Sequence, residues 1–175
     1  GKSTQIEAIK AFFEKKGEKV LITREPGGTP ISEKIRTIIL DRENKEMEPM
    51  TETMLYAAAR AQHVAQVIRP ALNEGIHVIC DRFLDSSIAY QGYGRGLVDC
   101  VAVINAYAVQ DCMPDLTFLL KLNPEIGRKR IDKEKQDRIE QESIDFHNRV
   151  FNGYEELELQ FPDRIVGIDA NQEIG

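Results

Sequence analysis

The sequence predicts an α/β domain in which a mostly parallel sheet of about five strands is covered by helices on both faces. Two observations predict this class. Short runs rich in Val, Ile, Leu or Phe recur along the chain, and segments of helical periodicity separate them. A length of 175 residues fits one domain, so we expect a single domain over the whole chain. Strands are expected at residues 19–22, 77–80, 116–122 and 164–168.

The first two helices have start and stop signals. Ile6, Ile9, Phe12 and Phe13 form an apolar stripe that predicts the first helix, and Gly17 can end it. Thr29 followed by Pro30 is typical of an N-cap and a first-turn proline. A second helix is therefore expected to start there, and its apolar positions are Ile31, Ile35 and Ile38.

The later helices are predicted from longer periodic segments. A third helix is expected over 51–74, with a kink at Pro70. A fourth is expected over 97–112, ending before Pro114. A charged stretch over 128–142 follows the third strand, and then comes a helix containing Phe146, Val150, Tyr154 and Leu157. The apolar stripe of the third helix consists of Met54, Ala58, Ala61, Ala65 and Ile68.

Composition excludes several classes of function. The formal net charge of −6 gives no general attraction to nucleic acid or to anionic lipid. No apolar run approaches the roughly 20 residues that a membrane-spanning helix needs. Cys80, Cys100 and Cys112 lack metal-ligand spacing, so we expect reduced, buried thiols in a reducing cytoplasm.

The chain opens on Gly1-Lys2-Ser3-Thr4, which is the tail of the Walker A pattern. In that pattern loop amides cradle phosphates, Lys reaches the β and γ groups, and the hydroxyl holds Mg²⁺. These four residues also open an amphipathic helix, whose N-terminus favours an anion. The alternative is an ordinary N-cap at Ser3 or Thr4. On the phosphate reading, we expect the P-loop NTPase three-layer fold with its first strand missing from this chain, and a covering helix missing after Gly175.

Two further segments place polar groups where strands are expected to end, and a third places them on one face of a helix. Residues 23–29 follow the first strand at the edge of the sheet where α/β folds collect ligands, although a plain turn with a solvated Arg24 is the alternative. Tyr56 and Arg60 lie one helical turn apart, so a ring and a guanidinium project from one face. Their alternative is a half-buried Tyr and a surface ion pair. Asp81 and Arg82 follow the second strand, where a structural salt bridge is the alternative.

Together these segments resemble the bacterial thymidylate kinases, a P-loop nucleoside monophosphate kinase family. The resemblance rests on Thr23 to Thr29, on Arg60-Ala61-Gln62-His63, and on Asp81-Arg82-Phe83 with Ser86, Ser87, Ala89, Tyr90 and Gln91. Residues 137–143 resemble the segment after the family's mobile lid. The resemblance covers essentially the whole chain and implies transfer of the γ-phosphoryl group of ATP to dTMP, giving dTDP and ADP, with Mg²⁺ as cofactor.

The resemblance also implies roles for individual residues. Arg24 and Arg82 would hold the acceptor phosphate, Asp81 would lie near it and its Mg²⁺, and Tyr90 would crowd the 2′ carbon of the sugar. The implied dTMP-binding set is Arg24, Tyr56, Arg60, Asp81, Arg82, Ser87, Tyr90 and Gln91. The ATP-binding set is Gly1, Lys2, Ser3 and Thr4, the metal ligands are Ser3 and Asp81, and the catalytic set is Lys2, Arg82, Arg128, Arg130 and Arg138. The lid would span about 128–142, although a solvated helix face is the alternative there, and a homodimer would form through 51–74 and 97–112.

Some positions depart from the family pattern. Tyr56 stands where the stacking residue is usually Phe, and Lys121 and Asn123 replace acids. The lid segment is short, with Lys133 and Lys135 where Arg is common. Two other functions remain open: a kinase for another nucleoside or nucleotide, and a nucleotide-dependent switch without an acceptor.

Overall fold

The computed structural model describes residues 2–129 and 136–171. Its first half contains α1 (Lys2–Lys15), β1 (Val20–Arg24), α2 (Pro30–Leu40), α3 (Pro49–His63), the π-helical turn η1 (Val64–Ile68), α4 (Arg69–Asn73) and β2 (His77–Asp81). Its second half contains α5 (Leu84–Ser87), the π-helical segment η2 (Ile88–Gly94), α6 (Val98–Val109), β3 (Thr117–Lys121), α7 (Pro124–Lys129), α8 (Ile144–Gln160) and β4 (Ile165–Asp169).

All four predicted strands form, in a mixed α/β fold with parallel pairing, but one sheet of about five strands is not shown. Among the described residues, β1 pairs with β2 and β3 pairs with β4, both parallel, in two separate sheets. Apolar runs locate strands, whereas the pairing of strands depends on which of them meet in space, so the number of strands in one sheet stays a prediction. The helices also leave part of the β3–β4 sheet uncovered, since Phe118 is 48% exposed and Val166 is 43% exposed.

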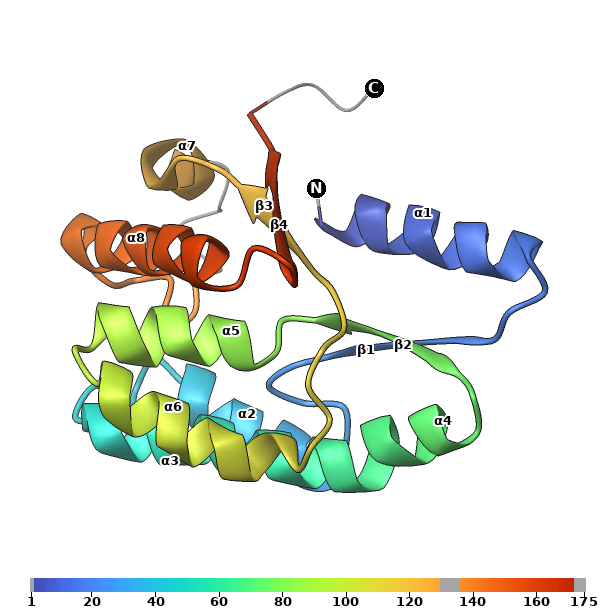
Figure 1. Cartoon of the computed structure of the whole chain (residues 1–175). Helices are drawn as coiled ribbons and strands as arrows, with labels where there is room; N and C mark the ends of the chain where they lie inside the picture. Colours follow the sequence, from blue (N-terminus) through green and yellow to red (C-terminus); the bar gives the residue numbers. More distant parts are fainter. Residues whose placement is uncertain (1, 130–135, 172–175) are drawn as a thin grey trace.

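The β1–β2 sheet sets the geometry of the site. Val20 lies opposite His77 and Arg24 lies opposite Asp81, so the two strands end side by side. Helices α1 and α4 contact this sheet from opposite sides, as Figure 1 shows. Side chains that follow β1 and β2 therefore gather at one edge, the edge at which open α/β folds bind ligands.

The predicted helix signals are confirmed with small shifts. Thr29 caps α2 by accepting a hydrogen bond from the Ser32 amide at 3.0 Å, and Gly17 follows α1 with φ +78°. The predicted kink near Pro70 takes the form of the wide turn η1, because proline has no N–H for the helical ladder and Arg69 donates instead to Val64. The segments α5, η2 and α7 were not predicted as helices, since they are short and lack a clear apolar period.

The buried face of α3 is not its apolar stripe. Met54 is 52% exposed, whereas Glu52 and His63 are fully buried and Arg60 is 2% exposed. The packing therefore inverts the usual arrangement of an amphipathic helix. Charges on the inner face need partners, because a buried charge without one is costly.

The hydrophobic core lies between α8 and η2, with Phe146 at its centre. Phe146 is 1% exposed and packs with Ala89, Ile139, Val150, Leu157 and Ile165. Gly94 allows this approach, since a Cβ there would lie 2.7 Å from the Phe146 ring. None of the described helices is long and apolar enough to cross a membrane. The expectation of buried thiols was wrong for Cys100, which is exposed, while Cys80 and Cys112 are half-buried.

We expect Phe146→Ala to lower the free energy of unfolding by about 3–5 kcal/mol, because it removes the largest side chain of the core and leaves a cavity. Urea denaturation measures the change. Leu159→Ala is the matched control on the same helix: Leu159 is 75% exposed, so its loss should change stability by no more than about 0.5 kcal/mol. Equal effects of the two substitutions would contradict this description of the core.

Candidate active site

The N-terminus of α1 meets the end of β2. The Lys2 ammonium donates a hydrogen bond to Asp81 Oδ1 at 2.8 Å. Partial burial and the nearby Arg82 charge lower the pKa of Lys2, and Asp81 works against that shift. Ser3 and Thr4 are exposed in the first turn of α1, while Gly1 lies outside the described residues. The first turn therefore brings a cation and two hydroxyl groups to the ligand edge of the sheet.

The loop between β1 and α2 folds around Glu33. Arg24 Nη2 donates to both Glu33 oxygens, at 3.1 and 3.0 Å, and the Gly28 amide donates to Oε1 at 2.9 Å. The Gly28 hydrogen bond is the main cause of a lowered Glu33 pKa. Glycine is required at position 28, since φ is +82° and a Cβ would lie 2.5 Å from His63 Nε2. Arg24 is thus held by an ion pair at the place where the acceptor phosphate was predicted.

Arg36 is a candidate that the sequence analysis missed. Its Nη1 donates to the Pro26 carbonyl at 2.9 Å, which turns the guanidinium toward the same loop. Burial and the neighbouring Arg24 charge lower the pKa of Arg36. The available signal was its position three residues after Glu33 on α2, which places both on one helical face.

Arg60 is buried and held from three elements. Its Nε donates to Glu25 Oε2 at 2.7 Å, and its Nη1 donates to Ser87 Oγ at 3.0 Å and to the Asn105 side-chain oxygen. The alternative of a surface ion pair is therefore excluded. The described residues offer no hydrogen-bond partner to Nη2, so the Arg60 guanidinium keeps one pair of donors for another group.

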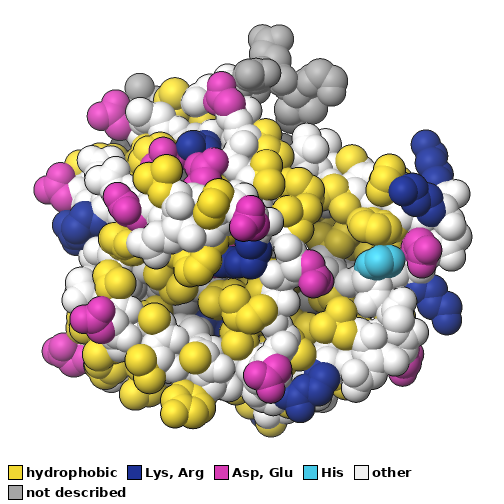
Figure 2. Space-filling view, in the orientation of Figure 1, with side chains coloured by type: hydrophobic (Ala, Val, Ile, Leu, Met, Phe, Trp, Pro, Cys, Tyr) yellow, Lys and Arg dark blue, Asp and Glu magenta, His cyan; other side chains and the backbone are white. Residues whose placement is uncertain are grey.

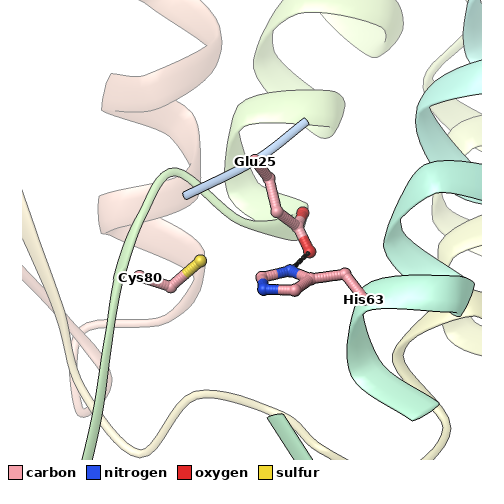
Figure 3. Close-up of side chains that lie close together, drawn as sticks. All are labelled: Glu25, His63 and Cys80. Atoms are coloured by element: carbon pink, nitrogen blue, oxygen red, sulfur yellow. Dashed lines mark hydrogen bonds and ion pairs between the residues drawn. The ribbon is translucent and has the colours of Figure 1, made fainter. Parts of the chain in front are cut away.

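Glu25 also joins Arg60 to a buried histidine. Its Oε1 lies 3.0 Å from His63 Nδ1, and His63 Nε2 lies 2.7 Å from Thr23 Oγ1. Figure 3 shows Cys80 beside Glu25 and His63, close enough for the three side chains to surround a cation. However, burial raises the pKa of the Cys80 thiol well above its usual range, and Arg60 already neutralises Glu25. The charges of these side chains therefore favour a hydrogen-bonded cluster at Glu25 and His63 over a metal centre.

Arg82 occupies a strained backbone conformation directly after β2. Its φ of +70° is uncommon for a residue with a Cβ, and such strain is typical of functional positions. Its Nη1 donates to Tyr154 Oη at 3.4 Å, and its guanidinium carbon lies 5.3 Å from the centre of the Tyr90 ring. Burial is the main cause that raises the pKa of Tyr154 to about 12. Asp81 pairs with Lys2, so a structural Asp81–Arg82 bridge does not account for these two residues.

Glu52 accepts hydrogen bonds from two of the predicted site residues, Gln91 and Arg138. Gln91 Nε2 donates to Glu52 Oε1 at 2.9 Å, and Arg138 Nη2 donates to Oε2 at 2.6 Å. Arg138 also donates to the Ile39 carbonyl, and it is nearly buried. These contacts anchor residues 136–143 to α3 and do not join Arg138 to Lys2 or Arg82, so its catalytic role stays a prediction. Nothing is described of the Arg128 side chain, and Arg130 lies outside the described residues.

Tyr56 is half-buried between these groups on α3. Burial, together with the nearby carboxylate of Glu52, raises its pKa above the usual value, so the phenol stays neutral. Tyr56 lies one turn after Glu52 and one turn before Arg60. The ring thus stands between the two buried ion-pair networks.

Comparisons with known proteins agree with this arrangement. The model of the family described as thymidylate kinase matches residues 1–175. Proteins called thymidylate kinase from Bacillus cereus, Bacillus anthracis and Bacillus thuringiensis are each 51% identical to this chain over 176 residues. Each match covers 98% of this chain and 85% of the relative. With a match of this extent over the residues that build the site, the chain belongs to the thymidylate kinase family.

Proposed function

We propose that this chain transfers the γ-phosphoryl group of ATP to dTMP, giving dTDP and ADP. The observation that supports it most is a gathering of cations where β1 and β2 end. Lys2 lies close enough to Arg82 for the two positive charges to repel each other. Arg36 lies close enough to Arg24 for the same effect. Phosphate groups bound between such cations would relieve the repulsion, and phosphoryl transfer mainly requires positioned charge of this kind.

The donor end of the site is formed by α1. Lys2 would bind the β and γ phosphates, while amides of the first turn and Ser3 and Thr4 face the same anions. Ser3 and Asp81 offer a hydroxyl and a carboxylate, and such hard oxygen ligands suit Mg²⁺. When bound there, Mg²⁺ supplies charge neutralisation on the phosphate oxygens.

The acceptor end is formed by α3 and by the residues after β1 and β2. Arg24, Arg36 and Arg82 would hold the phosphate of dTMP, and its oxygen needs no general base because it is ionised at neutral pH. The free Nη2 of Arg60 would donate to a thymine carbonyl beside the Tyr56 ring. Tyr90 would exclude a 2′ hydroxyl. Arg128, Arg130 and Arg138 stay candidates for cations that approach on closure.

A panel of acceptors tests the function. We expect ADP release to be fast with ATP and dTMP and at least about a hundred-fold slower, in kcat/KM, with thymidine or UMP, because the site is built for a phosphate, a thymine and a deoxyribose. A preference for thymidine or UMP would identify a kinase for another acceptor. Slow hydrolysis that no acceptor stimulates would identify a nucleotide switch.

We expect Lys2→Ala to lower kcat by about 10²–10³ while leaving the KM for dTMP nearly unchanged, because it removes charge stabilisation on the transferring phosphate. Steady-state kinetics with varied dTMP measures both constants. Lys10→Ala is the control on the same helix, since Lys10 lies in a surface pair with Glu14 at 3.7 Å. A full-rate Lys2→Ala enzyme would remove Lys2 from the mechanism.

We further propose that two copies associate through α3 and α6. The outer face of these helices exposes Met50, Met54, Val103 and Tyr107, the last at 81%. Figure 2 shows hydrophobic side chains over the lower part of the molecule, where α3 and α6 lie in Figure 1. Such an apolar face is typical of a protein interface. The free thiols fit a reducing cytoplasm as the place of this assembly.

Sedimentation velocity tests the association. We expect a dimer for the unmodified chain and a monomer for the double variant Val103→Asp, Tyr107→Asp, because unpaired carboxylates would be buried in the interface. Leu159→Asp, on the exposed side of α8, should stay dimeric. A monomeric unmodified chain at micromolar concentration would contradict the proposal.

A further inference from the structure

Glu52 is a buried carboxylate whose hydrogen-bonding capacity is fully used. Oε1 accepts from Gln91 Nε2 at 2.9 Å and from Arg95 Nε at 3.2 Å. Oε2 accepts from Arg95 Nη2 at 2.9 Å and from Arg138 Nη2 at 2.6 Å. Burial alone would raise the pKa of Glu52, but hydrogen bonds from Arg95, Gln91 and Arg138 lower it, so the group is ionised. An ionised carboxylate only accepts hydrogen bonds.

This fixes the orientation of the Gln91 amide. A glutamine amide has a donor end and an acceptor end, and only the donor end can face a carboxylate. Gln91 is 1% exposed, yet among the described residues its Oε1 has no hydrogen-bond partner. Oε1 is not a fully buried unpaired atom, so it stays open to a donor that a ligand supplies.

The position of this acceptor follows from the pairing of α3 with α5 and η2. Arg60 donates a hydrogen bond to Ser87, and Glu52 accepts one from Gln91. These two hydrogen bonds join α3 to the antiparallel helical segment from Ser87 to Gln91. The two hydrogen bonds start from residues eight positions apart on α3, about 12 Å along its axis, and Tyr56 lies midway between them. The donor Arg60 Nη2 and the acceptor Gln91 Oε1, neither of which bonds to a described residue, therefore flank the position of the Tyr56 ring.

We propose that Glu52 is a positioning residue that determines base specificity by holding Gln91 in the orientation that accepts a ring N–H. This inference rests on the proposed function. Thymine and uracil carry a proton on N3, between two carbonyl groups, whereas cytosine N3 is an acceptor. The pair formed by the Arg60 donor and the Gln91 acceptor matches a ring carbonyl next to an N–H and opposes the cytosine pattern.

The variant Glu52→Gln tests this role. Oε2 of the carboxylate accepts from two arginines at 2.9 and 2.6 Å, whereas Oε1 accepts from one arginine at 3.2 Å, so the new amide should keep oxygen at Oε2 and place nitrogen opposite Gln91. Gln91 would then turn its own oxygen toward Gln at position 52 and its NH₂ group toward the base. We expect the ratio of kcat/KM for dTMP to that for dCMP to fall at least about ten-fold, while Arg60 preserves part of the preference.

The matched control is Glu142→Gln. Glu142 Oε1 accepts from Arg95 Nη1 at 2.5 Å, so this variant weakens the same charge network without facing Gln91, and it should keep the wild-type ratio. A folded Glu52→Gln enzyme with the wild-type ratio would overturn the inference alone. A wild-type chain that does not prefer dTMP to dCMP would overturn the proposed function and the inference with it.

A second measurement needs no variant and decides the matter if Glu52→Gln fails to fold. In a ¹⁵N NMR spectrum of the wild-type chain, we expect the Gln91 side-chain NH₂ group to give two resolved protons, one of them protected from exchange with water by its bond to Glu52. The protection should persist when dTMP binds. Rapidly exchanging, averaged protons would refute the fixed orientation.

Discussion

The buried ion pair between Glu25 and Arg60 is the interaction on which the site depends. Glu25 follows β1, and Arg60 lies in α3, so the pair locks the ligand edge of the sheet to the helix that would face the base. Breaking such a pair typically costs about 3–5 kcal/mol, because one charge is left buried, although the intact pair contributes little net stability. The main effect of the pair is to fix the orientation of the Arg60 guanidinium.

The same pair explains why glycine is needed at position 28. His63 contacts the other oxygen of Glu25, and it packs so close to Gly28 that no side chain fits there. The loop that follows Glu25 therefore comes near α3, and Arg24 is carried with it toward Glu33. One carboxylate thus links the residues proposed for the base to those proposed for the acceptor phosphate.

Local signals in the sequence located most elements but few of the contacts within the site. Each strand was found within two residues because apolar runs and turns are local, and Thr29 and Gly17 marked helix ends by their own chemistry. Glu25, Glu52 and Asn105 were not singled out, since their importance comes from partners far along the chain. Arg60 lies 35 residues from Glu25, and Arg138 lies 86 from Glu52. Nothing in a local pattern distinguishes these carboxylates from solvated ones.

Arg138 illustrates the same limit from the other side. Its basic neighbours and its place after the lid segment favoured a role on phosphate, yet its guanidinium is bonded to Glu52 and to the Ile39 carbonyl. Charge alone does not separate a cation that binds a ligand from one that holds two elements together. The difference lies in which groups the guanidinium contacts, and only the folded chain reveals those contacts.

The inverted packing of α3 connects the site to the proposed association. Its inner face carries Glu52, Arg60 and His63, and its outer face carries Met50 and Met54. Polar groups on the inner face contribute less burial of apolar surface than a usual helix would, so the helix gains less from packing on its own domain. Apolar burial against a second copy would supply the missing part. A helix held in this way on both faces would keep Tyr56 at a fixed distance from the hydrogen bonds that join α3 to Ser87 and to Gln91.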